Sequence, residues 1–177
     1  NRDFRSQVAR LQAAGVQQIC LLGYGSDFPN LLRDLATSGL LGSVHVSGNL
    51  GFIELPPDTP TEYTQGVVFT SPPFLIDAQK SDRVRRFEEA YRTVYGNEVP
   101  SYSAYYAYDA VILLKEAVDI AGSSDPLAVM EALSSNTFDL MTGEYMFQNG
   151  DSHPPAILAQ WAAGELVPYA PTSEGQG

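Results

Sequence analysis

Three side chains, Tyr24, Ser26 and Asn49, have types and positions that point to ligand-binding chemistry. Tyr24 and Ser26 lie in the glycine-bearing turn that follows the apolar run Ile19–Leu22, and Asn49 follows the next short apolar run. Apolar runs that alternate with helical patterns are typical of parallel strands buried on both faces, and ligands bind beyond their carboxyl ends. The Asn49 side chain offers a donor and an acceptor. We therefore expect these residues to face a small molecule.

Structural explanations compete for the same residues. Gly23 suits a tight turn between a strand and a helix, with Ser26 or Asp27 as the helix cap. Tyr24 also suits a cover over the core, and Asn49 stands among ordinary turn residues. Four tyrosines crowd the start of one predicted helix, where they pack as core residues or one of them stacks on a ligand. These four are Tyr102, Tyr105, Tyr106 and Tyr108.

The sequence offers no coherent catalytic set, so we expect no enzyme and no metal or cofactor. It contains no Gly-x-Ser-x-Gly motif, and the Gly23–Asp27 turn has neither a P-loop lysine nor a third dinucleotide-binding glycine. Cys20, the single cysteine, has apolar neighbours and is expected to be buried. The pair Glu88-Glu89 is interpreted as solvated charge on a polar helix face. His45 and His153 lack partners at ligand spacing.

Composition limits the partners of this chain. The formal net charge is −11 over 177 residues, which argues against nucleic acid and against docking on anionic lipid. The length allows one ordinary domain or two small lobes, and no apolar run is long enough to span a bilayer. Residues Asn1 to Phe4 lie where the first helix is expected to begin, and no signal peptide opens the sequence. We therefore expect a processed or truncated piece of a longer protein.

The order of elements predicts an α/β fold with a parallel sheet and flanking helices. The first helix begins near Asp3, a plausible cap, and ends at Gly15. From residue 76 onward the chain is rich in helices, which suggests part of a second lobe. Predicted strands are 18–22, 44–46, 66–70, 144–147 and 156–161, the last two joined through the Asn149-Gly150 turn, and predicted later helices are 81–95, 103–121 and 126–133.

Motifs along nearly the whole chain resemble the type I periplasmic solute-binding proteins of ABC transporters, in particular the branched-chain amino-acid (Leu/Ile/Val) receptor family. The segments that carry the resemblance are Asp3-Phe4 to Gly15, Leu21-Leu22-Gly23-Tyr24, Gly66-Val67-Val68 with Ser71-Pro72-Pro73, Phe87 with Tyr91, Tyr95-Gly96 and Pro100, Tyr108-Asp109-Ala110-Val111, and Thr142-Gly143 with Phe147 and Asn149-Gly150-Asp151.

The resemblance implies a partial two-lobe fold, in which 1–75 and 155–177 belong to the second lobe and 76–154 to the first. It implies ligand contacts at Tyr24, Asn49 and Tyr102. Family members that bind amino acids often carry an acid in the Ser47-Gly48-Asn49 loop for the ligand ammonium, and no acid stands there in this chain.

The function implied is an extracytoplasmic receptor of an ABC importer. It would be periplasmic or extracellular and would capture an amino acid or a related polar or aromatic solute for an ABC permease. The alternative is a sensory or regulatory ligand-binding domain of the same fold. Since a truncated sheet exposes an edge, we also expect the piece to pair with a second copy, to swap elements, or to remain associated with a cleaved N-terminal half.

Overall fold

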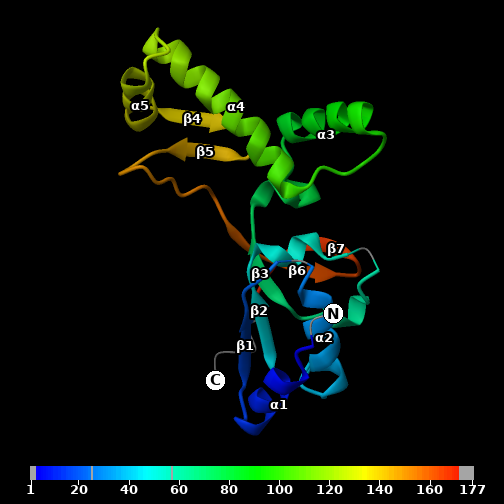
Figure 1. The fold of residues 1–177 in the computed structure, drawn as a ribbon. Coiled ribbons are helices and arrows are strands. Elements are labelled where there is room, and N and C mark those ends of the chain that lie inside the picture. The colour runs from blue at the N-terminus through cyan, green and yellow to red at the C-terminus, as the bar shows by residue number, and fades with distance from the viewer. Residues whose placement is uncertain (1–2, 25, 57, 172–177) are drawn as a thin grey trace. The chain divides into compact units, whose positions relative to one another are not determined.

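The computed structural model describes residues 3–24, 26–56 and 58–171, and these form two compact units. Unit 1 consists of Asn1–Ser71 and Ile157–Gly177, and unit 2 is Pro72–Ala156 (Figure 1). These boundaries lie a few residues from the predicted ones at 75/76 and 154/155. That unit 1 corresponds to the second lobe of a receptor, and unit 2 to the first, stays a prediction.

Unit 1 is built on a five-stranded mixed sheet in the order β1-β2-β3-β6-β7. The strands β1 (Gln18–Leu21), β2 (His45–Gly48) and β3 (Val68–Ser71) are parallel, as predicted. The strands β6 (Ile157–Ala162) and β7 (Glu165–Pro168) run antiparallel to their neighbours. Helix α1 (Arg5–Ala13) precedes β1, and helix α2 (Phe28–Thr37) connects β1 to β2. Parallel strands with a helical crossover confirm the α/β fold class.

The prediction that the first strand is buried on both faces is wrong. Ile19 and Leu21 are buried, whereas Cys20 is exposed and Leu22, just past the strand, is 78% exposed. Burial alternates because only one face of the sheet has apolar cover. Cys20 is therefore a surface thiol rather than a core residue.

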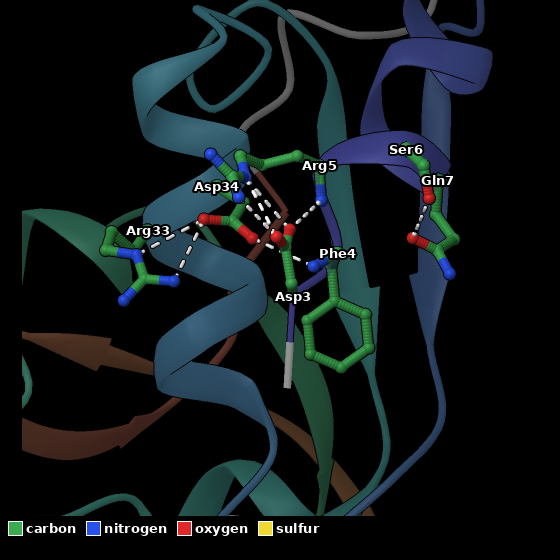
Figure 2. Close-up of polar contacts among 7 residues, drawn as sticks. All are labelled: Asp3, Phe4, Arg5, Ser6, Gln7, Arg33 and Asp34. Atoms are coloured by element: carbon green, nitrogen blue, oxygen red, sulfur yellow. Dashed lines mark hydrogen bonds and ion pairs between the residues drawn. The ribbon is translucent and has the colours of Figure 1, made fainter. Parts of the chain in front are cut away.

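Asp34, a buried carboxylate on α2, ties the start of the chain to this helix (Figure 2). It accepts a hydrogen bond of 3.0 Å from the Phe4 backbone N–H and pairs with Arg33 at 3.1 Å. Asp3 is not the cap residue of α1; Phe4 is, and Asp3 instead pairs with Arg5. The carboxylate of Asp34 thus satisfies a backbone donor that the first helix leaves unpaired.

A row of aromatic rings crosses the covered face of the sheet. Phe28 stacks on Phe52 with ring centroids 4.2 Å apart, and Phe52 stacks on Phe69 at 5.5 Å. Phe69 in turn contacts Trp161 on β6 at 6.4 Å. Phe52 lies in the short 3-10 helix η1 (Leu50–Glu54), so this row fixes the segment after β2 against the sheet. A second short turn, η2 (Thr61–Tyr63), precedes β3.

Unit 2 combines three helices with a two-stranded antiparallel sheet. The helices are α3 (Asp82–Tyr95), α4 (Tyr102–Ala121) and α5 (Pro126–Ser135), the short turns are η3 (Pro73–Leu75) and η4 (Asp77–Gln79), and the strands are β4 (Thr137–Leu140) and β5 (Gly143–Met146). The strand β4 was not predicted from the sequence. The predicted late strands, seen as β5 and β6, pair with β4 and β3 and not with each other.

Glu88 on α3 is buried, so its interpretation as solvated charge is wrong. Its carboxylate accepts a 2.7 Å hydrogen bond from the Tyr105 hydroxyl and pairs with the Lys80 ammonium at 2.8 Å and with Arg92 at 3.5 Å. Burial opposes the charge, but the hydrogen bonds and the two cations prevail and lower the pKa of Glu88 below its ordinary value. The charged form is therefore the one that this cluster stabilises.

Candidate functional site

The carboxyl ends of β1, β2 and β3 lie along the same side of the unit 1 sheet. We call this side, where the three parallel strands end, the edge. The register pairs Leu21 with Gly48 and Gly48 with Phe69, so the segments after the strands are neighbours. The first segment carries Tyr24, which is 78% exposed, and Ser26, which is exposed. The second carries Asn49, which is half-buried. Tyr24, Ser26 and Asn49, the residues predicted from the sequence, therefore lie on neighbouring segments at this edge.

Asn49 joins the two segments directly. Its Oδ1 accepts a hydrogen bond of 3.4 Å from the Gly23 backbone N–H, and its own backbone N–H donates to the Leu21 carbonyl at 3.3 Å. Gly51 lets the segments approach each other, because a Cβ there would lie 2.5 Å from the Gly23 carbonyl oxygen. The loop bearing Tyr24 and the loop bearing Asn49 are thus held as one surface.

The turn after β1 leads straight into α2. The Asp27 backbone N–H donates to the Tyr24 carbonyl at 2.9 Å, and Asp27 is the N-cap residue of α2. Of the two predicted cap residues, Asp27 takes the N-cap position, but its side chain makes no capping hydrogen bond. Gly25 lies outside the described residues. A carboxylate at this position suits the positive end of the helix.

Tyr102 belongs to unit 2, where it begins α4 and is half-buried. Its ring meets Tyr106 edge-on at 6.4 Å. Burial first, then the nearby phenols of Tyr145 and Tyr102 and the charge of Asp109, raise the pKa of Tyr106 to about 12. Tyr105 is a core residue bonded to Glu88, so packing explains it. Tyr102 as a ligand contact stays a prediction.

The motif residue Asp109 has a structural role. Its buried carboxylate accepts hydrogen bonds from the Thr142 backbone N–H at 2.7 Å and hydroxyl at 2.6 Å, and from the Met141 N–H at 3.3 Å. The Thr142 hydroxyl also lies 2.7 Å from the Tyr145 hydroxyl. The motif that contains Asp109 and the Thr142-Gly143 motif, which are far apart in the sequence, therefore form one hydrogen-bond network at the β4–β5 turn.

A hollow of about 410 Å³ lies in unit 2 between α3, α4 and β4. Phe87 and Tyr108, whose ring centroids are 5.0 Å apart, form part of its wall, and Arg86 and Glu116 line it as well. Among the described residues, no group of three His, Cys, Asp or Glu side chains could hold a metal ion. The volume of the hollow lies in the range of small-molecule pockets, which makes it a second candidate place for a ligand.

Sequence reasoning missed the residues that support the edge. No role was predicted for Gly51 or Phe52, and Trp161 was predicted only as the end of a strand. Trp161 donates its indole N–H to the Phe52 carbonyl at 2.9 Å, a contact across 109 positions of the sequence. The spacing Gly48, Gly51, Phe52 was the available signal, since a Cβ at position 48 would lie 2.3 Å from the Phe52 ring.

Parallel strands, a helical crossover and a second, helix-rich unit define the class of this chain as an α/β protein of two compact units. The periplasmic binding protein family model matches residues 1–165, and the chain belongs to that family. It is a family of solute-binding proteins rather than of enzymes.

Relatives and a solved structure agree with this assignment. The chain is 30% identical over 176 residues to a Leu/Ile/Val-binding protein homolog 2 of Brucella abortus (strain 2308), covering 95% of this chain and 44% of that protein. It is 30% identical over 158 residues to a leucine-, isoleucine-, valine-, threonine- and alanine-binding protein of Pseudomonas aeruginosa, covering 85% and 39%. A type 1 periplasmic binding protein from Bordetella pertussis Tohama I shares the fold, with a TM-score of 0.77 and 24% identity over 96% of this chain and 50% of that one.

The chain spans less than half the length of these curated relatives. Across the part of the chain that the structure describes, no helix is both long and apolar enough to cross a membrane.

Proposed function

We propose that this chain is part of an extracytoplasmic receptor that captures a small solute and delivers it to an ABC permease. The solute is an amino acid or a related polar or aromatic compound. The single observation that carries the proposal is the shared edge, where the exposed Tyr24 ring and the half-buried Asn49 amide stand on two adjoining segments. Family membership supports the same role.

Each site residue has a physical part in this proposal. Tyr24 packs its ring on the apolar body of the solute, and this contact recovers the cost of leaving a large aromatic side chain in water. Asn49 hydrogen-bonds the polar end, and Ser26 assists from the turn before α2. Tyr102, which lies in unit 2, is a further proposed contact of the solute in the complete receptor.

A thermal-shift screen tests this function on the 177-residue chain. Amino acids, aromatic acids and amides are added in turn, and compounds that co-purify with the protein are identified by mass spectrometry. At least one compound should raise the melting temperature, since a ligand that binds only the folded state stabilises it.

The matched variants are Tyr24→Ala and Tyr95→Ala, each of which removes an exposed aromatic ring. Tyr24→Ala should abolish the shift, whereas Tyr95→Ala on α3 should keep it. A ligand shift that survives in Tyr24→Ala would show that the solute binds elsewhere.

A further inference from the structure

The orientation of the Asn49 amide is fixed by its partner. The Gly23 backbone N–H donates to Asn49 at 3.4 Å, and of the two polar atoms of that amide only the oxygen can accept. The Nδ2 group, with two N–H donors, has no hydrogen-bond partner among the described residues. Because Asn49 is half-buried at the open edge, these donors are available to a ligand.

The other groups at this edge are compatible with a ligand that accepts hydrogen bonds. Tyr24 and Ser26 bring hydroxyls, which donate as readily as they accept. Asp27 is the carboxylate of the turn; it occupies the N-cap of α2 and already has an interaction partner in the chain. On the segment that bears Asn49, the first acid is Glu54, an exposed residue at the far end of η1.

We infer that the ligand presents a carboxylate to the Asn49 Nδ2 donors and needs no ammonium group, so that the substrate class is a small monocarboxylate with an apolar or aromatic body. This inference rests on the proposed function. A carboxylate gains charge-assisted hydrogen bonds at Nδ2. An ammonium placed at the Nδ2 group would face two N–H donors in place of an acceptor, which costs binding free energy.

Three compounds that share one branched body separate the two ends of the ligand. Leucine carries both charged groups, isocaproate lacks the amine, and isoamylamine lacks the carboxylate. Dissociation constants are measured by ligand-observed NMR on the 177-residue chain, which detects millimolar binding. We expect isocaproate to bind at least about tenfold more tightly than isoamylamine, and leucine to bind no more tightly than isocaproate.

The substitution Asn49→Asp changes only the group that the inference concerns. Aspartate keeps the shape and an oxygen for the Gly23 N–H, but it replaces the Nδ2 donors with a charged acceptor. Isocaproate affinity should fall by about tenfold or more, and isoamylamine affinity should rise. The control Asn97→Asp makes the same charge change on an exposed residue of unit 2 and should alter neither affinity.

The outcomes separate this inference from the proposed function. If leucine or isoamylamine binds the unaltered chain at least tenfold more tightly than isocaproate, the receptor function stands and the carboxylate inference is wrong. The same holds if Asn49→Asp leaves both affinities unchanged. If none of the three compounds binds, and no compound of the thermal-shift screen does, the proposed function fails and this inference fails with it.

Discussion

Asp109 is the residue whose burial and partners give the sharpest prediction about stability. It accepts three hydrogen bonds at the β4–β5 turn, and its removal would leave buried donors unpaired. Asp109→Ala should lower the free energy of unfolding by about 2–4 kcal/mol, measured by urea denaturation. Asp119→Ala, on the same helix but exposed and paired only with Lys115, should cost about 0–1 kcal/mol. Equal losses in the two variants would contradict the role of Asp109.

Glu88 makes stability depend on pH on the acid side. Its pKa in the folded protein lies below the ordinary value, so the unfolded chain binds a proton first as the pH falls. The stability that the charged form contributes is therefore complete above the unfolded pKa and is lost as the pH falls through the folded pKa. Urea unfolding of the parent protein and of Glu88→Gln, followed from neutral to acidic pH, measures this contribution.

The direction in which the stability difference between the parent protein and Glu88→Gln changes with pH tests whether Glu88 is charged in the folded state. The parent protein should be more stable than Glu88→Gln near neutral pH, and the difference should shrink with acidification. The control Glu89→Gln, an exposed neighbour on α3, should show no such convergence. A stability difference between Glu88→Gln and the parent that grows as the pH falls would show that Glu88 is protonated in the folded state.

At the scale of elements, η1 is held by aromatic packing, and this packing positions the Asn49 segment. Phe52 is fully buried and stacks between Phe28 and Phe69. Phe52→Ala should lower the free energy of unfolding by about 3–5 kcal/mol and should also weaken solute binding, since η1 loses its anchor. Phe138→Ala, a comparable change in the core of unit 2, should destabilise the protein without a direct effect at the unit 1 edge. Solute affinity unchanged in folded Phe52→Ala would contradict this link.

The elements also show what local sequence can and cannot predict. The parallel strands β1 to β3 were predictable because apolar runs and glycine turns are local signals. β4 was missed because its pattern, with Phe138 and Leu140 buried, follows α5 with no glycine or proline between them. The exposure of Cys20 depends on which face of the sheet is covered, and the burial of Glu88 depends on Lys80 and Tyr105; neither is visible in a short window.

The candidate site divides in the same way. Tyr24 and Asn49 were predictable because strand ends are marked by composition. The contact between Trp161 and Phe52 was not, since it joins segments that only the folded sheet brings together.

At the scale of the whole molecule, the bare sheet face leads us to expect self-association. β1 is an edge strand among the described residues, and the exposed side chains of Cys20 on this strand and of Leu22 just past it carry no charge. Edge strands without charge or proline pair readily with another chain. Light scattering after size exclusion should show a dimer that Leu22→Lys weakens, while Leu127→Lys on α5 should leave it intact. A monomer at all concentrations would refute this expectation.

The account depends most on the edge that bears Tyr24 and Asn49, and an amide-resolved NMR titration tests it most directly. The compound that gives the largest thermal shift is added to the labelled 177-residue chain. We predict that the largest changes in chemical shift occur at the backbone amides of Gly23, Tyr24 and Asn49. Changes confined to the unit 2 hollow, at Arg86 and Tyr108, would contradict the account.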